Sequence, residues 1–233
     1  MQSQPDSKST AADHRTRVGA LRREKMRARL VESAFLVVAR FGVDAGVIDR
    51  VITEAKVSRG TFYNYFKTDR EMFIAVATEV GNEILRIVDP VVQRHEDAAS
   101  RIACGIRMVL EMATSMPLLA DFIVRGGPES LRYSSLVTEV VPRDLRMGWE
   151  SGQFIVEDPT VAHDLLMGPV YLAFHSISLA NVQGDFSRNL ARGVLMSLGV
   201  GVREAESICL RPVPLAVIPD DSLFAKALRR NEA

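Results

Sequence analysis

Apolar residues recur at helical spacing through most of the chain, and no stretch alternates in the way that a β-strand would. A first stripe predicts a helix that ends near Gly42, with an inward face made by Leu30, Ala34, Val38 and Phe41. A shorter pattern predicts a second helix over about 47–55, with a buried face made by Ile48, Val51, Ile52 and Ala55. The pattern therefore predicts an all-α fold.

Capping signals place the later helices. Thr68 and Glu71 form a capping box that starts a long helix over about 69–88, which Asp89-Pro90 is expected to stop. Asp158-Pro159 is a second start signal, because Asp caps the helix and Pro fits its first turn. Further helices are expected at about 97–115, 117–125, 129–151, 159–182 and 187–199, with breaks at Gly126-Gly127-Pro128 and Gly199-Val200-Gly201.

The two ends of the chain differ from the middle. Residues 1–20 are polar and predict a disordered basic arm. The last thirty residues contain Pro212, Pro214 and Pro219, which predict an extended tail with a short final helix. The expected domains are the arm (1–20), a small helical domain (21–68), a larger helical domain (69–202) and a C-terminal tail (203–233).

Charge is distributed unevenly although the formal net charge is zero. Residues 1–70 hold 14 Lys and Arg against 8 Asp and Glu, a net charge of +6, and the rest of the chain carries −6. A basic third on an acidic body favours two domains with different partners, one of them nucleic acid. The alternative is a chance asymmetry of solvated surface. Several cations precede or open the first helix, where they would enter the minor groove or add only non-specific attraction: Arg15, Arg17, Arg22, Arg23, Lys25, Arg27 and Arg29.

Two observations bear on the compartment. Cys104 and Cys209 make neither a disulfide framework nor a metal-ligand cluster, and the first twenty residues have no apolar signal-peptide core. The uncharged stretch 165–184 has the length of a membrane span, but it contains Pro169 and His175 and lacks a basic flank. We expect a buried or interface helix there and a cytoplasmic protein.

Residues 58–67 (Ser-Arg-Gly-Thr-Phe-Tyr-Asn-Tyr-Phe-Lys) predict a short helix with two distinct faces. Phe62 and Phe66 lie four residues apart and share one face, which we expect to pack on the two preceding helices. Arg59 lies at the amino end, where recognition helices touch base edges, and it suits a bidentate contact with guanine. Gly60 lets the backbone approach DNA closely. The alternative is a solvated helix face above two core phenylalanines.

These residues identify a family resemblance. Phe41-Gly42, then Val57-Ser58-x-Gly60-Thr61-Phe62-Tyr63-x-Tyr65-Phe66, then a capped long helix resemble the DNA-binding domain of TetR (tetracycline-repressor-type) transcriptional regulators over about residues 22–70. The resemblance implies a helix-turn-helix and a dimer that binds operator DNA. It also implies a DNA-binding role for Arg59, Gly60, Thr61, Tyr63, Asn64, Tyr65 and Lys67, to which the cap adds Ser58.

The supporting helix departs from the family pattern. Gly46-Val47 stand where the family has a capping Thr followed by a residue that often touches phosphate. Ile52 replaces a small Ala, and Lys56 replaces a turn Gly. We expect a changed packing angle, and at Lys56 either a strained backbone or a turn that is wound differently.

The resemblance also implies a ligand cavity in the larger domain and a four-helix dimer interface made by its last two long helices. The uncharged 165–184 stretch suits that interface, as do Leu190, Val194, Leu195 and Leu198. Adaptable methionines and rigid aromatics are the candidates for the cavity, with ordinary core packing as the alternative: Met108, Met112, Phe122, Trp149, Tyr171, Phe174 and His175. The expected effector is apolar with one or two polar groups.

The sequence therefore predicts a ligand-responsive repressor that binds a palindromic operator as a dimer and is released by a small effector. No cofactor, metal site or membrane partner is expected. The four histidines lie apart and form no catalytic or metal-binding set, so we do not expect an enzyme. Two alternatives stay open: a DNA-binding regulator without an effector, and a helical small-molecule binder whose DNA binding is vestigial.

Overall fold

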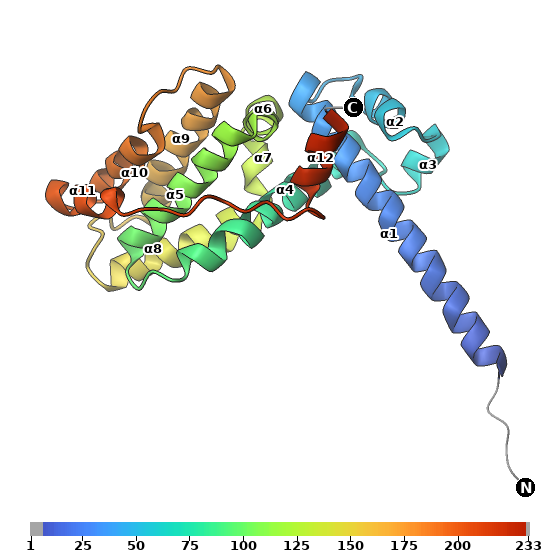
Figure 1. Cartoon of the computed structure of the whole chain (residues 1–233), viewed down its shortest axis with the longest axis horizontal. Helices are drawn as coiled ribbons and strands as arrows, with labels where there is room; N and C mark the ends of the chain where they lie inside the picture. Colours follow the sequence, from blue (N-terminus) through green and yellow to red (C-terminus); the bar gives the residue numbers. More distant parts are fainter. Residues whose placement is uncertain (1–6, 232–233) are drawn as a thin grey trace, which may run out of the picture.

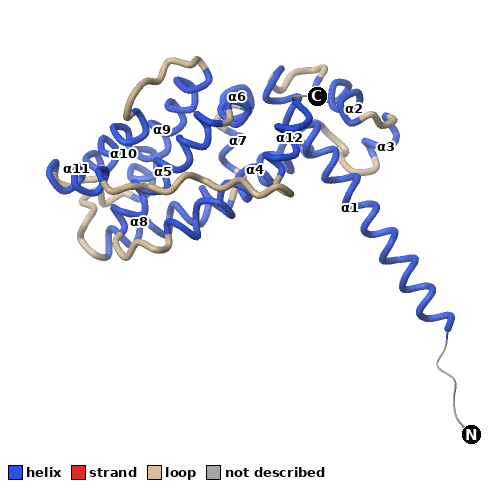
Figure 2. The backbone as a smooth tube through the Cα atoms, viewed as in Figure 1, coloured by secondary structure: helices blue, strands red, loops and turns tan. Residues whose placement is uncertain are grey.

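The computed structural model describes the backbone of residues 7–231 and the side chains of residues 17–231. Residues 7–231 contain no β-strand, which confirms the all-α prediction (Figure 2). The helices in chain order are α1 (Ser7–Phe41), α2 (Val47–Ala55), α3 (Arg59–Tyr63), α4 (Asp69–Val92), α5 (Ala98–Ser115), α6 (Pro117–Gly126), α7 (Glu129–Arg132), the π-helical turn η1 (Leu136–Val140), α8 (Val141–Glu150), α9 (Pro159–Ser178), α10 (Phe186–Ser197), α11 (Val202–Leu210) and α12 (Leu223–Asn231).

Helices α1, α2 and α3 form a small three-helix unit at one end of the molecule (Figure 1). Leu30, Ala34 and Val38 of α1 are buried as predicted. Phe41, the last residue of the predicted stripe, is instead 56% exposed, and the Arg50 guanidinium lies 5.1 Å from the centre of its ring. Helix α1 ends before Gly42, whose φ of +78° suits a residue without a Cβ.

The prediction of a disordered arm over residues 1–20 is wrong for its described part. Helix α1 begins at Ser7 and runs for 35 residues, so residues 7–20 extend it beyond the three-helix unit (Figure 1). Residues 1–6 lie outside the described residues. The basic segment is therefore a projecting helix from Ser7 onward.

The larger body is a bundle of helices from α4 to α11. Helix α5 lies in its interior and packs against α4, α8, α9, α10 and α11, while α6 bridges α1 and α9. Helix α4 continues through Pro90 to Val92, four residues beyond the predicted stop. Pro90 lies in the last turn, where its missing N–H leaves the Arg86 carbonyl without a helical hydrogen bond.

Helix boundaries inside the body differ from the prediction at three places. The helix expected over 129–151 is divided into α7, η1 and α8, because Ser134 packs closely against Gly81 of α4 and diverts the chain. Pro142 then fits the first turn of α8, which needs no donor at that position. Helix α9 ends at Ser178 and α10 at Ser197, both earlier than predicted.

The C-terminal segment also differs from the predicted tail. It opens with α11, which was not predicted, and then runs in an extended form through residues 211–222. The expected final helix is present as α12. Figures 1 and 2 show that the extended segment passes along the body and brings α12 back to the three-helix unit.

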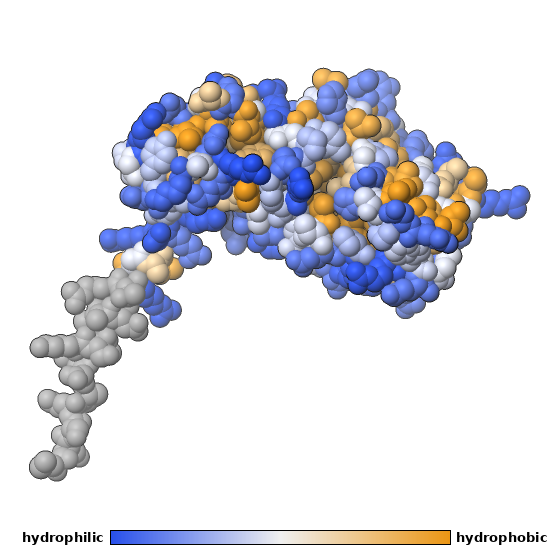
Figure 3. All heavy atoms as spheres, turned by 180° about the vertical axis from the view of Figure 1, so that it is seen from behind, coloured by the Kyte–Doolittle hydropathy of each residue, from blue (hydrophilic) through white to orange (hydrophobic). Residues whose placement is uncertain are grey.

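Within residues 7–231, no single helix has the length and apolar character of a membrane span. The pair α5 and α6 passes the same test only when taken together, and the two helices are bent by 104°. Hydrophobic side chains do reach the surface of the body at the end farthest from α1 (Figure 3). Val202 and Leu210 of α11 are among the exposed hydrophobic residues.

Candidate DNA-binding surface and ligand cavity

The start of α3 is fixed by the cap that the sequence predicts. The Ser58 Oγ accepts a hydrogen bond from the Thr61 backbone N–H at 3.1 Å and lies 2.8 Å from the Thr61 hydroxyl. Helix α3 has only five residues, and its exposed first turn carries Arg59 and Gly60. A Cβ on Gly60 would meet only the Ser58 Oγ at 3.9 Å, so the space outside this turn is open.

The two faces of the 58–67 segment are arranged as predicted. Phe62 and Phe66 are buried with ring centres 5.8 Å apart, and they attach the segment to the core. The predicted DNA-binding residues lie on the other side. Ser58, Arg59, Gly60, Asn64 and Lys67 are exposed, and Thr61, Tyr63 and Tyr65 are half-buried.

Both cations of this surface have partners within the protein. Arg59 forms an ion pair with Asp49 of α2, and the Lys67 Nζ donates to the Tyr63 carbonyl at 2.9 Å. The Arg59–Asp49 pair is exposed on both sides. Such pairs contribute little to stability, so a phosphate or a guanine edge would compete for Arg59 at low cost.

The supporting helix α2 compensates for its missing Thr cap. Gly46 supplies no side-chain cap, but the Asp44 Oδ1 accepts from the Gly46 backbone N–H at 2.9 Å. The same carboxylate binds Arg50 at 2.6 Å, and this hydrogen bond, followed by that from Gly46, holds the pKa of Asp44 below its usual value. Val47 is buried, so its side chain makes no phosphate contact.

Lys56 adopts the left-handed conformation, with φ 52° and ψ 51°. The backbone N–H of Val57 donates to the Ile52 carbonyl at 3.1 Å, so the turn closes as it would with the family's Gly. Of the two expectations for this position, the strained backbone is the one observed. Ile52 is half-buried and packs against the core.

The projecting part of α1 and the recognition segment form a basic groove. Its lining combines two arginines of α1 with three of the predicted DNA-binding residues: Gly19, Arg22, Arg23, Met26, Thr61, Asn64 and Tyr65. The Arg23 guanidinium lies 5.9 Å from the centre of the Tyr65 ring. Arg22 and Arg23 are both exposed, and no carboxylate among the described side chains pairs with either of them.

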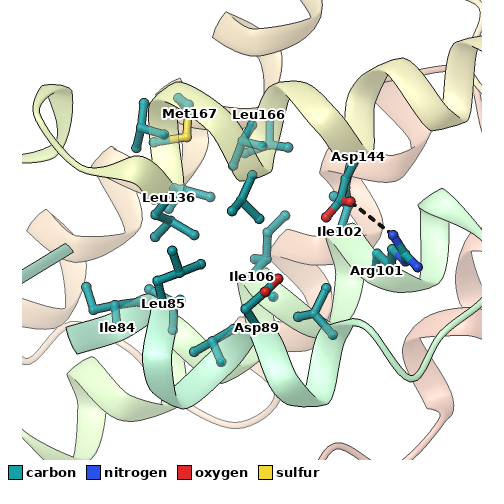
Figure 4. A pocket seen from close by; sticks show the side chains of 18 of the residues that line it. Ile84, Leu85, Asp89, Arg101, Ile102, Ile106, Leu136, Asp144, Leu166 and Met167 are labelled. Atoms are coloured by element: carbon teal, nitrogen blue, oxygen red, sulfur yellow. Dashed lines mark hydrogen bonds and ion pairs between the residues drawn. The ribbon is translucent and has the colours of Figure 1, made fainter. Parts of the chain in front are cut away.

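A cavity of about 80 Å³ lies inside the body, between α4, α5, the η1–α8 segment and α9. Its wall is almost entirely hydrophobic and includes Ile84, Ile106, Leu136, Leu166, Met167 and Phe174. Figure 4 shows the charged exceptions, Asp89, Arg101 and Asp144, along one side of this space.

The charged side of the cavity is an internally paired cluster. Buried Asp144 accepts from Arg143 Nε at 2.9 Å and pairs with Arg101 Nη1 at 3.4 Å. Arg143 also reaches the Asp89 Oδ1 at 3.2 Å. The hydrogen bond to Asp144 raises the pKa of Arg143. A polar group entering the cavity would meet fixed, charged hydrogen-bonding partners on this side.

Comparison with known proteins decides the family. The crystal structure of RolR in complex with resorcinol is 30% identical in sequence, with a TM-score of 0.67, and the alignment covers 85% of this chain and 100% of RolR. The chain belongs to the TetR family of transcriptional regulators.

Other matches agree with this TetR-family assignment. Residues 97–211 match the family described as "Tetracyclin repressor-like, C-terminal domain". RolR without ligand is 28% identical over 82% of this chain and 100% of its own, with a TM-score of 0.66. FadR from Bacillus subtilis, solved with stearoyl-CoA, is 19% identical over 73% of this chain and 96% of its own, with a TM-score of 0.55, and shows the fold alone. No curated protein matched.

In this TetR-family chain, only one predicted ligand-binding residue lines the cavity. That residue is Phe174. Met108, Met112 and Phe122 are buried core residues, which was the alternative given for them. Tyr171 is half-buried and His175 is exposed on α9. Trp149 lines a separate outer groove with Arg146 and His163.

The sequence analysis missed Asp89, Arg101 and Asp144. Each lies on a helix whose buried residues are mostly apolar, and a charge among them was the signal available. Asp89 was instead interpreted as part of a helix stop with Pro90. Among the described residues, no three His, Cys, Asp or Glu side chains gather in a way that could hold a metal ion.

Part of the predicted dimer set is also wrong. Val194 and Leu195 of α10 and Leu198 directly after it are buried in the core of this protomer, because α10 turns that face toward α5. Leu190 is half-buried. Exposed apolar positions of this region lie on α9, directly after it and on α10: Val161, Leu172, Leu179 and Met196.

Proposed function

We propose that this TetR-family regulator is a repressor that binds a palindromic operator as a homodimer and releases it when a small, largely apolar effector enters the cavity. The observation that carries the proposal is the course of α4. This helix begins three residues after Phe66 and ends on the cavity wall, with Ile84, Val88 and Asp89 among its lining residues. One rigid element therefore joins the recognition segment to the effector site.

On the DNA side, the exposed first turn of α3 would enter the major groove. Arg59 would exchange its Asp49 partner for a base edge, while Tyr63, Tyr65 and Lys67 would contact phosphates. Ser58, Gly60, Thr61 and Asn64 complete the proposed surface. Buried Val47 contributes nothing, so the operator contacts differ from those of relatives that have a polar residue there.

The dimer would form through α9 and α10. Val161 and Leu172 of α9 and Leu179 directly after it recur at helical spacing, and Leu172 is 64% exposed. Gly168 of α9 and Gly193 of α10 have open space where a Cβ would stand, which allows a partner helix to approach closely. A two-fold dimer would present two recognition helices to successive major grooves, about 34 Å apart.

The cavity favours an effector with an apolar ring and a polar substituent. RolR was crystallised with resorcinol, which has this character. The space of about 80 Å³ is smaller than the roughly 150 Å³ of an engineered cavity that binds benzene. An aromatic effector must therefore widen the cavity, and the widening would move α4 and displace the recognition helices.

The same small volume supports a second candidate, a DNA-binding regulator with no effector. One experiment separates the two. A palindrome is first selected from random duplex DNA with the full chain. A panel of monocyclic aromatic compounds, beginning with resorcinol, is then tested for thermal stabilisation of the protein and for loss of operator binding.

We expect at least one compound to do both. Binding of compound and of operator should weaken each other by the same factor, because the coupling free energy is reciprocal. Asp89→Asn should reduce affinity for that compound about tenfold while keeping operator affinity, since it removes a charged acceptor on the cavity wall. Glu79→Gln, which changes an exposed pair with Arg86 on the same helix, is the matched control.

Each outcome assigns the function. Compounds that stabilise the protein without affecting operator binding would leave the regulator without an effector. Failure to select any palindrome would favour the third reading, a small-molecule binder with vestigial DNA binding.

A further inference from the structure

The C-terminal helix α12 lies far in space from α11, the helix that precedes it in the chain. The chain leaves α11 at the distal end of the body, passes along the body as the extended segment 211–222, and ends as α12 against α1 and α4 (Figures 1 and 2). Along this path Val213, Ala216 and Ile218 pack on the hydrophobic core. The last helix of the regulator thus contacts its DNA-binding unit.

The apolar face of α12 is fully integrated into that unit. Leu223, Phe224 and Ala227 are buried, and Phe224 has no exposed surface. The Phe224 ring lies 5.9 Å from the ring centre of Phe35 in α1, and Phe35 lies 5.2 Å from Phe122 in α6. One aromatic cluster therefore joins α12, the DNA-binding unit and the body.

Arg230 of α12 links α1 to α2. Its Nη2 donates to the Glu54 carbonyl at 2.9 Å and to the Glu54 Oε1 at 3.0 Å, near the carboxyl end of α2. Its Nη1 donates to the Ser33 hydroxyl at 3.1 Å and lies 3.8 Å from Glu32, both on α1. A planar guanidinium suits this role because it holds several acceptors in fixed directions.

The other end of the C-terminal segment is anchored near the effector cavity. Arg211 Nη1 donates to the Ser100 hydroxyl on α5 at 2.9 Å, and Arg107 of α5 donates to the carbonyl oxygens of Cys209 and Arg211. The cavity residue Arg101 follows Ser100 directly. The C-terminal segment therefore connects α5, which lines the cavity, with α1 of the three-helix unit.

We propose that Arg230 is a positioning residue for operator recognition: by joining Glu54 of α2 to Glu32 and Ser33 of α1, it sets the orientation of the helix-turn-helix on the body. The proposal rests on the proposed function and adds a residue to it. Arg230 lies on the α1–α2 side of the unit and does not belong to the predicted DNA-binding set.

The test compares Arg230→Gln with Arg229→Gln in the full chain. Both variants remove one positive charge from α12, but the Arg229 guanidinium donates to the Asp220 carbonyl inside the C-terminal segment. Affinity is measured for the selected palindrome and for an unrelated duplex of equal length. A misoriented pair of recognition helices should lose the palindrome and keep the electrostatic attraction to any duplex.

For Arg230→Gln we expect a loss of about fivefold or more on the palindrome, the lower range of allosteric couplings, and unchanged binding to the unrelated duplex. Arg229→Gln should bind both as the parent does. Equal palindrome affinity of Arg230→Gln and the parent would overturn the proposal. So would an equal loss on both duplexes, because that result indicates a charge effect alone.

A second readout does not depend on DNA. Amide hydrogen exchange across α2 should be faster in Arg230→Gln than in Arg229→Gln, because α2 loses the hydrogen bonds that join Glu54 to α12 and keeps only the Arg40–Glu54 pair with α1. An unchanged exchange rate across α2 overturns the positioning role of Arg230, even if no palindrome is ever found for the parent. Failure to find a palindrome would instead contradict the proposed function. If Arg230→Gln does not fold, Glu54→Gln takes its place with the same two expectations, because it removes the carboxylate that Arg230 and Arg40 share.

Discussion

Lys56 ends α2 in a conformation that costs an L-residue about 1–2 kcal/mol, because its Cβ approaches the neighbouring carbonyl. Glycine avoids that cost. We therefore expect Lys56→Gly to raise the free energy of unfolding by about 0.5–1 kcal/mol relative to Lys56→Ala, after the extra entropy of glycine in the unfolded chain. Both variants lose the ammonium group, so the comparison isolates the backbone. Urea unfolding measures the difference, and equal midpoints with equal slopes would show that the turn carries no strain.

The outward-facing positions of the 58–67 segment were predictable because their signal is local. Ser58 caps α3, and Phe62 and Phe66 share a face four residues apart, so the outward positions follow from helical geometry. The cavity residues were not predictable in the same way. Asp89, Arg101 and Asp144 come from three helices, and only packing of those helices brings them together. A charged residue in a sequence is usually solvated, so these three were not recognised as cavity residues.

At the scale of elements, helix starts were predicted better than helix ends. The side chains of Thr68, Asp97 and Asp158 all accept hydrogen bonds from the first turns of the helices that they cap. Each helix start is therefore determined by residues close to it in the sequence. The interruption between α7 and α8 depends on contact between distant residues. A Cβ on Gly81 would stand 1.9 Å from the Ser134 Cβ, so α4 and the chain before η1 approach each other as closely as glycine allows.

This contact yields a prediction about the cavity wall. Gly81→Ala should destabilise the protein by about 1–3 kcal/mol, because Ser134 presents its own Cα and Cβ and cannot rotate away. Gly105→Ala is the control, since a Cβ there meets only Val92 at 3.6 Å, and it should be neutral or slightly stabilising. Thermal unfolding compares the two variants. A Gly81→Ala protein as stable as Gly105→Ala would mean that η1 moves aside without cost.

At the scale of the whole molecule, charge and shape act together. The sequence predicted a basic N-terminal third of net charge +6, but it placed Arg15 and Arg17 on a disordered arm and let the other cations precede or open the first helix. The structure places them along a helix that begins at Ser7 and projects beyond the three-helix unit, with Arg22 and Arg23 beside Thr61 and Asn64. Residues 7–20 are too polar for their sequence to predict a helix. In the structure they form one continuous helix with the buried part of α1. Position, more than net charge, is what makes this segment part of the proposed DNA-binding surface.

The expected consequence is a change in salt dependence. A dimer would present four of these guanidinium groups to DNA, and each phosphate contact contributes about −0.9 to the slope of log affinity against log salt concentration. The double variant Arg22→Gln/Arg23→Gln should therefore bind its operator more weakly and with a slope shallower by about 3 to 4. Arg94→Gln/Arg203→Gln removes the same charge from exposed positions on the body and should leave the slope unchanged. If both pairs of substitutions lower affinity equally and keep the parent's slope, the groove between α1 and α3 does not contact DNA, and recognition rests on the α3 segment alone.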